Sequence, residues 1–173
     1  MTLPAIPRIE TDRLVLCAPV LNDLPAVTAF FASEQSHWVG GPKDALGASQ
    51  TLNATIGHWV TRGFGMWYVT DKLTNAWLGC VGFMFAPGWD EPELGWSVSQ
   101  NAQGQGIAFE ATQAARAYGA KHLNLDGVIS YINPANTRSL RLAKRLEATY
   151  ERATELLGTP CQVHRHPTLQ EAA

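Results

Sequence analysis

The segment VSQNAQGQGIAFEATQAA, residues 98–115, is the most informative part of the sequence. A strand ends at its start, a short polar loop carries Gly104 and Gly106, and an alanine-rich helix follows at once. Two glycines this close leave the backbone bare of side chains, so consecutive N–H groups can converge on one anion. The first N–H groups of the helix have no partner within it, and the helix dipole favours negative charge there. Because Ala108 keeps the first turn small, the segment suits a pyrophosphate.

Three ligands with a pyrophosphate could bind such a loop: the nucleotide of a P-loop protein, a dinucleotide, or coenzyme A. A P-loop needs the sequence Gly-Lys-Ser/Thr, and no lysine follows this loop. A dinucleotide fingerprint needs a third glycine where Phe109 stands, and the preceding strands do not begin a βαβ unit. Coenzyme A remains, beside the alternative that Gly104 and Gly106 only shape a turn from strand to helix.

Hydrophobic periods and turn signals around this segment predict the other elements. The predicted strands cover residues 13–19, 65–72, 77–86, 93–100, 127–133, 149–157 and 161–166. The predicted helices cover residues 21–33, 44–62, 106–122 and 136–146. The second, third and fourth strands are joined by connections too short for a crossover, so they are antiparallel. The order predicts an α/β (α+β) fold, with a mixed, mostly antiparallel sheet of about seven strands and helices on both faces.

Composition limits the function classes. The 173 residues suit a single domain, residues 1–173, with 46% hydrophobic and 16% charged residues. A net charge of −2 with scattered Lys and Arg argues against nucleic acid as the main partner. No apolar run approaches the roughly 20 residues of a membrane span, and the start does not resemble a signal peptide. We therefore expect no membrane association and a cytoplasmic location.

Metal binding is not expected. Cys17, Cys80 and Cys161 are too scattered for a disulfide framework or a zinc site. His164 and His166 alternate near Cys161, but no carboxylate or second cysteine has the spacing of a further ligand.

A specific resemblance strengthens the coenzyme A interpretation. The signature Q/R-x-x-G-x-G/A of the GNAT (Gcn5-related N-acetyltransferase) superfamily is matched at every defined position by Gln103, Gly104, Gln105, Gly106, Ile107 and Ala108. The longer run ELGWSVSQNAQGQGIAFEA, residues 93–111, resembles the branch typified by ribosomal-protein N-terminal acetyltransferases. IETDRLVL at 9–16 resembles the first strand of that branch, and INPANTRSLRLAKRLEA at 132–148 its later helix.

Two residues depart from the pattern of the branch. Cys17 stands where the branch commonly has arginine, and Glu147 stands where a glycine usually ends the later helix. Neither position touches the coenzyme signature. Both leave the subfamily and the substrate open.

The resemblance implies a coenzyme site. The backbone N–H groups from Gln103 to Ala108 would hold the pyrophosphate of acetyl-CoA. The strand with Trp96 and Val98 would splay from its parallel neighbour at 127–133, and the pantetheine arm would hydrogen-bond in the gap. In the same family pattern, Asn136 would contact the pantetheine arm and Ser139 would lie near the thioester sulfur. The alternatives are a helix cap for Asn136 and an idle serine for Ser139. Four cations on the later helix could reach the 3′-phosphate or form a solvated face: Arg138, Arg141, Lys144 and Arg145.

The resemblance also implies the chemistry, direct attack of a primary amine on the thioester of acetyl-CoA. The amine arrives largely protonated, and a carboxylate acting directly or through water can remove that proton. Glu93 is the candidate base. Its alternative is a structural role, pairing with a neighbouring arginine or a loop N–H, and Asp90 and Glu91 are neighbouring substitutes. Ser139 or Tyr150 would return a proton to the thiolate. The N–H of Val98 would bond to the carbonyl oxygen.

The acceptor amine stays open between a protein N-terminus and a small molecule. Trp38, Trp59, Trp67 and Trp89 fall in or near segments that would line its pocket, which favours an uncharged or hydrophobic amine, although burial is their default explanation. The alternative function is a non-catalytic acyl-CoA-binding or sensing domain, and a scaffold fits poorly with an intact signature. Self-association through the tail strands is common in the family, which adds a homodimer to the implied partners without any signal in this sequence.

Overall fold

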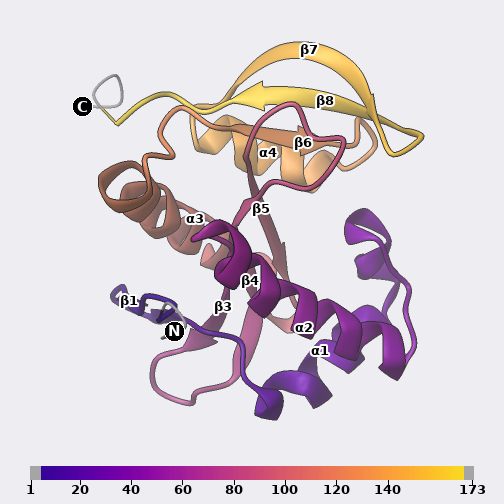
Figure 1. Ribbon diagram of the computed structural model, residues 1–173, viewed down its shortest axis with the longest axis vertical. Coiled ribbons are helices and arrows are strands. Elements are labelled where there is room, and N and C mark those ends of the chain that lie inside the picture. Colours follow the sequence, from indigo (N-terminus) through magenta and orange to yellow (C-terminus); the bar gives the residue numbers. More distant parts are fainter. Residues whose placement is uncertain (1–4, 170–173) are drawn as a thin grey trace.

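The computed structural model describes residues 5–169, which contain one mixed sheet of eight strands in the order β1-β2-β3-β4-β5-β6-β8-β7 (Figure 1). The strands are β1 (Ile9–Glu10), β2 (Leu14–Cys17), β3 (Met66–Asp71), β4 (Trp77–Met84), β5 (Glu93–Val98), β6 (Ile129–Ile132), β7 (Thr149–Leu156) and β8 (Thr159–Arg165). The helices are α1 (Leu24–Phe31), α2 (Ala45–Arg62), α3 (Ile107–Tyr118) and α4 (Thr137–Arg145). Shorter helical turns are η1 (Leu21–Asp23), η2 (Glu34–Val39), η3 (Gln100–Ala102) and η4 (Gly119–Leu123).

The mixed, mostly antiparallel sheet confirms the predicted fold class. The strand beyond the seven expected is β1, which pairs antiparallel with β2 through only two residues. A strand this short has no room for the alternation of apolar and polar residues that identifies strands in a sequence. Within the described residues, no helix combines the length and apolar character needed to cross a bilayer.

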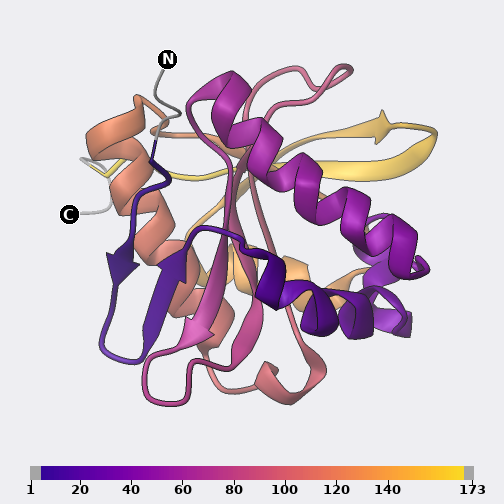
Figure 2. The same cartoon turned by 60° about the horizontal axis from the view of Figure 1, so that its bottom comes forward.

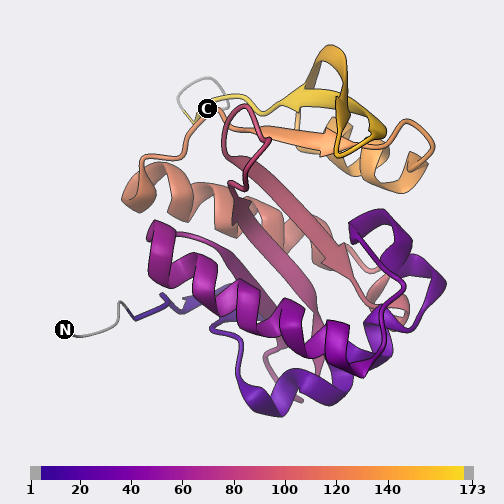
Figure 3. The same cartoon turned by 45° about the vertical axis from the view of Figure 1, so that its right-hand side comes forward.

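The two faces of the sheet are covered by different helices. Figures 2 and 3 show α1 and α2 on one face and α3 with α4 on the other. Alternate residues of β3 serve the two sides, because successive side chains of a strand point to opposite faces. Trp67 and Val69 join the core cluster that includes α3, whereas Tyr68 packs with α1 and α2. The sheet therefore has a packed apolar cluster on each face.

The sheet opens in its middle. Strands β4 and β5 pair along six residues, from Met84 with Glu93 to Gly79 with Val98. The parallel strands β5 and β6 instead pair at one position, Glu93 with Ile129, and then separate. At the point of separation, the Ser130 hydroxyl donates a 2.5 Å hydrogen bond to the Leu94 carbonyl oxygen. The predicted splayed pair is thus present.

The end of α4 explains one departure from the family pattern. Glu147 has a φ of 63°, in the left-handed region. Its N–H donates to the Lys144 carbonyl at 3.1 Å, and the Ala148 N–H donates to the Ala143 carbonyl at 2.9 Å. These two bonds form a Schellman motif, whose left-handed residue is usually glycine. The family glycine is therefore a backbone requirement, and here a glutamate adopts the same conformation at an energetic cost.

Replacing Glu147 by glycine should stabilise the protein. We expect Glu147→Gly to raise the free energy of unfolding by about 0.5–1 kcal/mol, because glycine adopts a positive φ without strain. The midpoint of thermal unfolding should rise on the order of 2 °C. Glu147→Ala is the matched control, because it removes the charge and keeps the strained backbone. Equal stabilisation by alanine in calorimetry would show that charge, not backbone strain, is responsible.

Candidate active site

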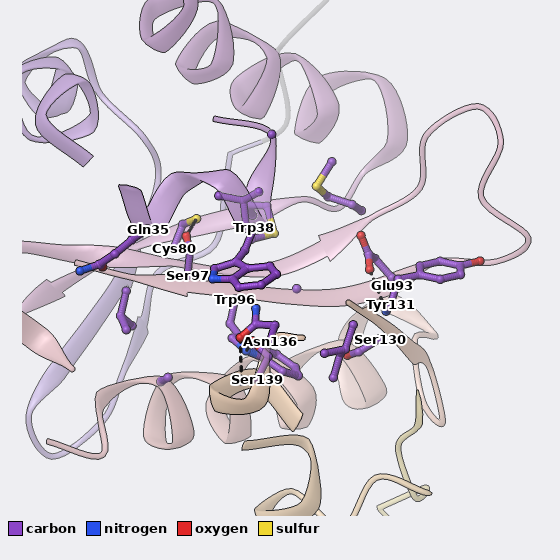
Figure 4. A pocket seen from close by; sticks show the side chains of 18 of the residues that line it. Gln35, Trp38, Cys80, Glu93, Trp96, Ser97, Ser130, Tyr131, Asn136 and Ser139 are labelled. Atoms are coloured by element: carbon purple, nitrogen blue, oxygen red, sulfur yellow. Dashed lines mark hydrogen bonds between the residues drawn. The ribbon is translucent and has the colours of Figure 1, made fainter. Parts of the chain in front are cut away.

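A cavity of about 1580 Å³ opens where β5 and β6 separate. Its walls come from the middle of the sheet, α2, α4, η2 and residues 103–108, which we call the signature loop (Figure 4). A site for one small molecule usually measures about 300–1,000 Å³. The volume therefore suits two ligands that meet inside the cavity.

The signature loop forms one end of this cavity. Gly104 and Gly106 have φ angles of 74° and 78°, a conformation that favours glycine. Gly106 is the N-cap of α3 and has no side chain to satisfy the first N–H groups of the helix. Ile107 and Ala108, in the first turn, line the cavity together with both glycines. The loop can therefore present several N–H donors and a helix N-terminus to a phosphate.

Most residues predicted for the site lie on the cavity wall. Those that line it are Glu93, Trp96, Val98, Gln103, Gly104, Gly106, Ile107, Ala108, Asn136 and Ser139. Gln105 does not, because its side chain donates to the Asn101 carbonyl at 2.6 Å. Tyr150 lies outside as well, on the outermost strand, with 57% of its surface exposed and its ring 5.9 Å from that of His164.

A clamp on the signature loop was missed by the sequence analysis. Arg13, just before β2, donates from Nη1 to the Gln105 carbonyl at 3.0 Å and from Nε to Glu110 Oε2 at 2.7 Å. Thr11 Oγ1 donates to Glu110 Oε1 at 2.5 Å. Partial burial alone raises the pKa of Glu110, but the hydrogen bonds from Thr11 and Arg13 outweigh it and lower the pKa below its usual value. The ionised pair fixes the loop to the first turn of α3.

The gap between the strands exposes backbone groups of β5. The Ser99 N–H donates to the Leu78 carbonyl at 2.8 Å and so points toward β4. Because backbone groups alternate in direction along a strand, those of Trp96 and Val98 point toward the gap. An extended ligand lying there could hydrogen-bond to them as an additional strand does.

The side chains of Trp96, Asn136 and Ser139 lie together beside the gap (Figure 4). Asn136 caps α4 by accepting a 3.1 Å hydrogen bond from the Ser139 N–H at Oδ1. Trp96 Nε1 donates to Ser139 Oγ at 3.2 Å. Since Ser139 Oγ is an acceptor in this contact, its own proton is available for a group in the cavity. Asn136 therefore both caps α4 and lies on the cavity wall.

Glu93 is the acidic residue of the cavity wall. Its Oε1 accepts from Trp89 Nε1 at 2.9 Å, and its Oε2 accepts from the Tyr131 N–H at 3.2 Å. Burial raises the pKa of Glu93, although these two hydrogen bonds oppose the rise. A carboxylate with a raised pKa and unused lone pairs is a better proton acceptor than an exposed one.

The two acidic residues that precede Glu93 in the sequence pair with arginines. Asp90 pairs with Arg152 at 2.6 Å, and Glu91 forms a bidentate pair with Arg165 at 2.7 and 2.8 Å. Neither lines the cavity. The structure thus places Glu93 on the cavity wall, but neither of the two substitutes that the sequence left open.

The tryptophans divide into two groups. Trp38 and Trp89 line the cavity. Trp59 and Trp67 are buried in the core, where their indole N–H groups donate to the carbonyls of Met66 at 2.9 Å and Pro7 at 2.8 Å. The first two therefore can contact a ligand, and the other two stabilise the fold.

The histidines of the tail form no metal-binding cluster with other potential ligands in residues 5–169. His166 is buried and its Nε2 lies 2.9 Å from Ser130 Oγ, where β5 and β6 part. Because Ser130 donates to Leu94, His166 is the donor to Ser130. Burial lowers the pKa of His166 to about 3, so the ring is neutral at physiological pH.

The family is decided by comparison of the whole chain with known proteins. The model of the acetyltransferase (GNAT) domain matches residues 13–149. The chain belongs to the GNAT acetyltransferase family. This result confirms the resemblance that the signature loop indicated.

Solved structures support the same assignment. An acetyltransferase from Agrobacterium tumefaciens has a TM-score of 0.86 and 30% identity, covering 96% of this GNAT chain and 97% of its own. A putative ribosomal-protein-serine acetyltransferase from Vibrio cholerae has a TM-score of 0.75 and 24% identity over 92% and 95% of the two chains. RimL, a ribosomal L7/L12 α-N-protein acetyltransferase in complex with coenzyme A, has a TM-score of 0.74 and 19% identity over 92% and 96%. The last two are distant enough to show only the shared fold.

The clamp should affect coenzyme affinity through position rather than charge. We expect Arg13→Lys to raise the dissociation constant of acetyl-CoA about 5-fold, roughly 1 kcal/mol. Lysine keeps the charge but cannot bridge Gln105 and Glu110 with a planar fork. Arg8→Lys is the control, since Arg8 makes an exposed pair with Glu10 away from the loop. Equal affinity of the Arg13→Lys variant and the unaltered protein in calorimetry would contradict the clamp.

Proposed function

We propose that this GNAT protein transfers an acetyl group from acetyl-CoA to a primary amine. The carrying observation is that one cavity joins the anion-binding signature loop, the open edge of β5 and the carboxyl group of Glu93. The signature loop suits a pyrophosphate, and the open edge of β5 suits an extended pantetheine arm. The Glu93 carboxyl group suits an amine. Coenzyme A bound to RimL, which shares the fold, supports the identity of the acyl carrier.

Each chemical requirement has a candidate group on the cavity wall. Glu93 accepts the proton of the ammonium group, and the neutral nitrogen then attacks the thioester carbonyl carbon. The N–H of Val98, which points into the gap, stabilises the developing oxyanion. As the carbon–sulfur bond breaks, Ser139 Oγ–H gives its proton to the thiolate, since its oxygen already accepts from Trp96. The second proton that the attacking nitrogen loses then restores the Ser139 hydroxyl. Alignment of the two reactants in one cavity supplies much of the acceleration.

The acceptor side of the cavity is rich in aromatic rings, which supports an amine with an apolar portion. The aromatic residues lining it on the α1 and α2 side and its rim are Phe30, Phe31, Trp38, Tyr68 and Trp89. Both a peptide N-terminus and a small-molecule amine meet this requirement. We place the reaction in the cytoplasm, as the sequence analysis predicts.

Removal of the proposed base should lower turnover and change its pH dependence. We expect Glu93→Gln to reduce kcat about 100-fold, within the range for general-base catalysis, and to leave acetyl-CoA affinity nearly unchanged. In the unaltered protein, activity should rise with pH as Glu93 loses its proton, with a midpoint above the ordinary value of 4.5 because burial raises its pKa. This acidic limb should disappear in the variant.

Glu91→Gln is the matched control for this experiment. It makes the same change on a glutamate that pairs with Arg165 and does not line the cavity. Steady-state release of the coenzyme A thiol measures both variants. An unchanged acidic limb in Glu93→Gln would refute the assignment of the base. Acetyl-CoA binding without thiol release for any amine would instead support the non-catalytic acyl-CoA-binding alternative.

A further inference from the structure

Lys43 places a cation without an acidic partner on the cavity wall. Its backbone N–H donates to the Phe31 carbonyl at 2.9 Å, which fixes its position after α1. Its Nζ donates to Thr51 Oγ1 at 2.8 Å and lies 4.6 Å from the centre of the Phe31 ring. None of the ion pairs formed within residues 5–169 includes Lys43. Two of the three ammonium protons therefore remain available to a ligand.

This position does not favour stability. The Lys43 ammonium lies level with Thr51, beyond the first turn of α2, and no carboxylate among the described residues pairs with it. Burial also lowers its pKa, which shows that the surroundings disfavour the charged form. The side chain lies against Gly47, where an added Cβ would come within 3.0 Å of Lys43 Cβ. A charged side chain in surroundings that disfavour its charge indicates a functional role rather than a role in stability.

The cavity has an opposite charge at its other end. Among the described residues that line it, Glu93 is the one carboxylate. Glu93 pairs with Met84, and the next residue, Phe85, donates its N–H to His58 Nε2 at 3.1 Å. Along the axis of α2, Glu93 therefore lies at the height of His58, whereas the Lys43 ammonium lies at the height of Thr51. Seven residues of helix rise separate these levels by about 10 Å.

We propose that Lys43 forms a subsite for an anionic group, a carboxylate or a phosphate, that the acceptor amine carries at least about 10 Å from its nitrogen. This proposal rests on the proposed function, because it assumes that the amine lies at Glu93. Three extended residues span about 10 Å, so a short peptide with a free carboxylate has the required length. The acceptor is then an amine with an anionic end, in contrast to the uncharged amine favoured by the tryptophans alone.

The phosphates of the coenzyme have their own partners elsewhere. The signature loop and the arginines of α4 that line the cavity, Arg138, Arg141 and Arg145, lie with α3 and α4. Lys43 lies in the segment between α1 and α2, and Figure 3 shows these two helices on the face of the sheet away from α3. The segment between α1 and α2 also meets the signature loop, where Gln103 Nε2 donates to Gln35 Oε1 at 2.7 Å. We assign the anion at Lys43 to the acceptor because of the face on which the lysine lies, and acetyl-CoA binding by a Lys43 variant tests this assignment.

The test uses matched pairs of alanine peptides, two to four residues long, each with a free carboxylate or a C-terminal amide. Release of the coenzyme A thiol gives kcat and KM for each peptide. We expect trialanine to have a KM at least about 10-fold below that of trialaninamide, as for one charge-assisted contact. Lys43→Met should remove this preference by raising the KM of trialanine, with no change for the amide. Lys121→Met, on the exposed η4 turn, is the control and should behave like the unaltered protein.

Three results would count against the subsite. Equal KM values within every acid–amide pair would overturn it, as would a Lys43→Met variant that keeps the preference. Weaker acetyl-CoA binding by Lys43→Met, measured by calorimetry without acceptor, would assign the lysine to the coenzyme instead. If hydrophobic amines are acetylated and no peptide acid is preferred to its amide, the subsite is refuted and the proposed function is supported. If no amine releases thiol although acetyl-CoA binds, the proposed function fails and the subsite with it.

Discussion

The separation of β5 from β6 after a single residue pair is the constraint on which the site depends. A continuous parallel pair would use the backbone groups of Trp96 and Val98 within the sheet, whereas the gap leaves them for a ligand. The Ser130 hydroxyl and the neutral ring of His166 hold the strands together at the fork. Because this contact is buried, the opening begins at a defined position. The signature loop, α4 and Glu93 then surround the opening, and the cavity is a consequence of the divided sheet.

Local sequence patterns predicted the parts of the site that depend on backbone form. Gly104 and Gly106 indicated the phosphate loop, because only a few backbone conformations need glycine. At Glu147 the family resemblance marked a missing glycine, and the structure shows that this position has a positive φ. The two-residue strand β1 was missed, because two residues give no period to detect.

Contacts between distant residues could not be read from the sequence. Arg13 and Glu110 are 97 residues apart, and no spacing rule connects them. Lys43 gave no signal either, because its significance lies in the absence of an acidic partner on the cavity wall. Among the nearby acids, only the folded chain shows that Asp90 and Glu91 have arginine partners while Glu93 faces the cavity. The sequence thus predicted more residues for the proposed coenzyme end of the site than for the proposed acceptor end.

Calorimetric titration with acetyl-CoA of the intact protein, Ala108→Glu and Gln113→Glu tests whether the signature loop binds the coenzyme. Ala108 lines the cavity in the first turn of α3, where an acidic residue suits the helix but repels a phosphate. Gln113 lies on the exposed face of the same helix and receives the same charge. We predict binding by the intact protein and by Gln113→Glu, and a loss of at least about 10-fold in affinity for Ala108→Glu. No binding by the intact protein, or equal binding by all three, would contradict a coenzyme site at the signature loop.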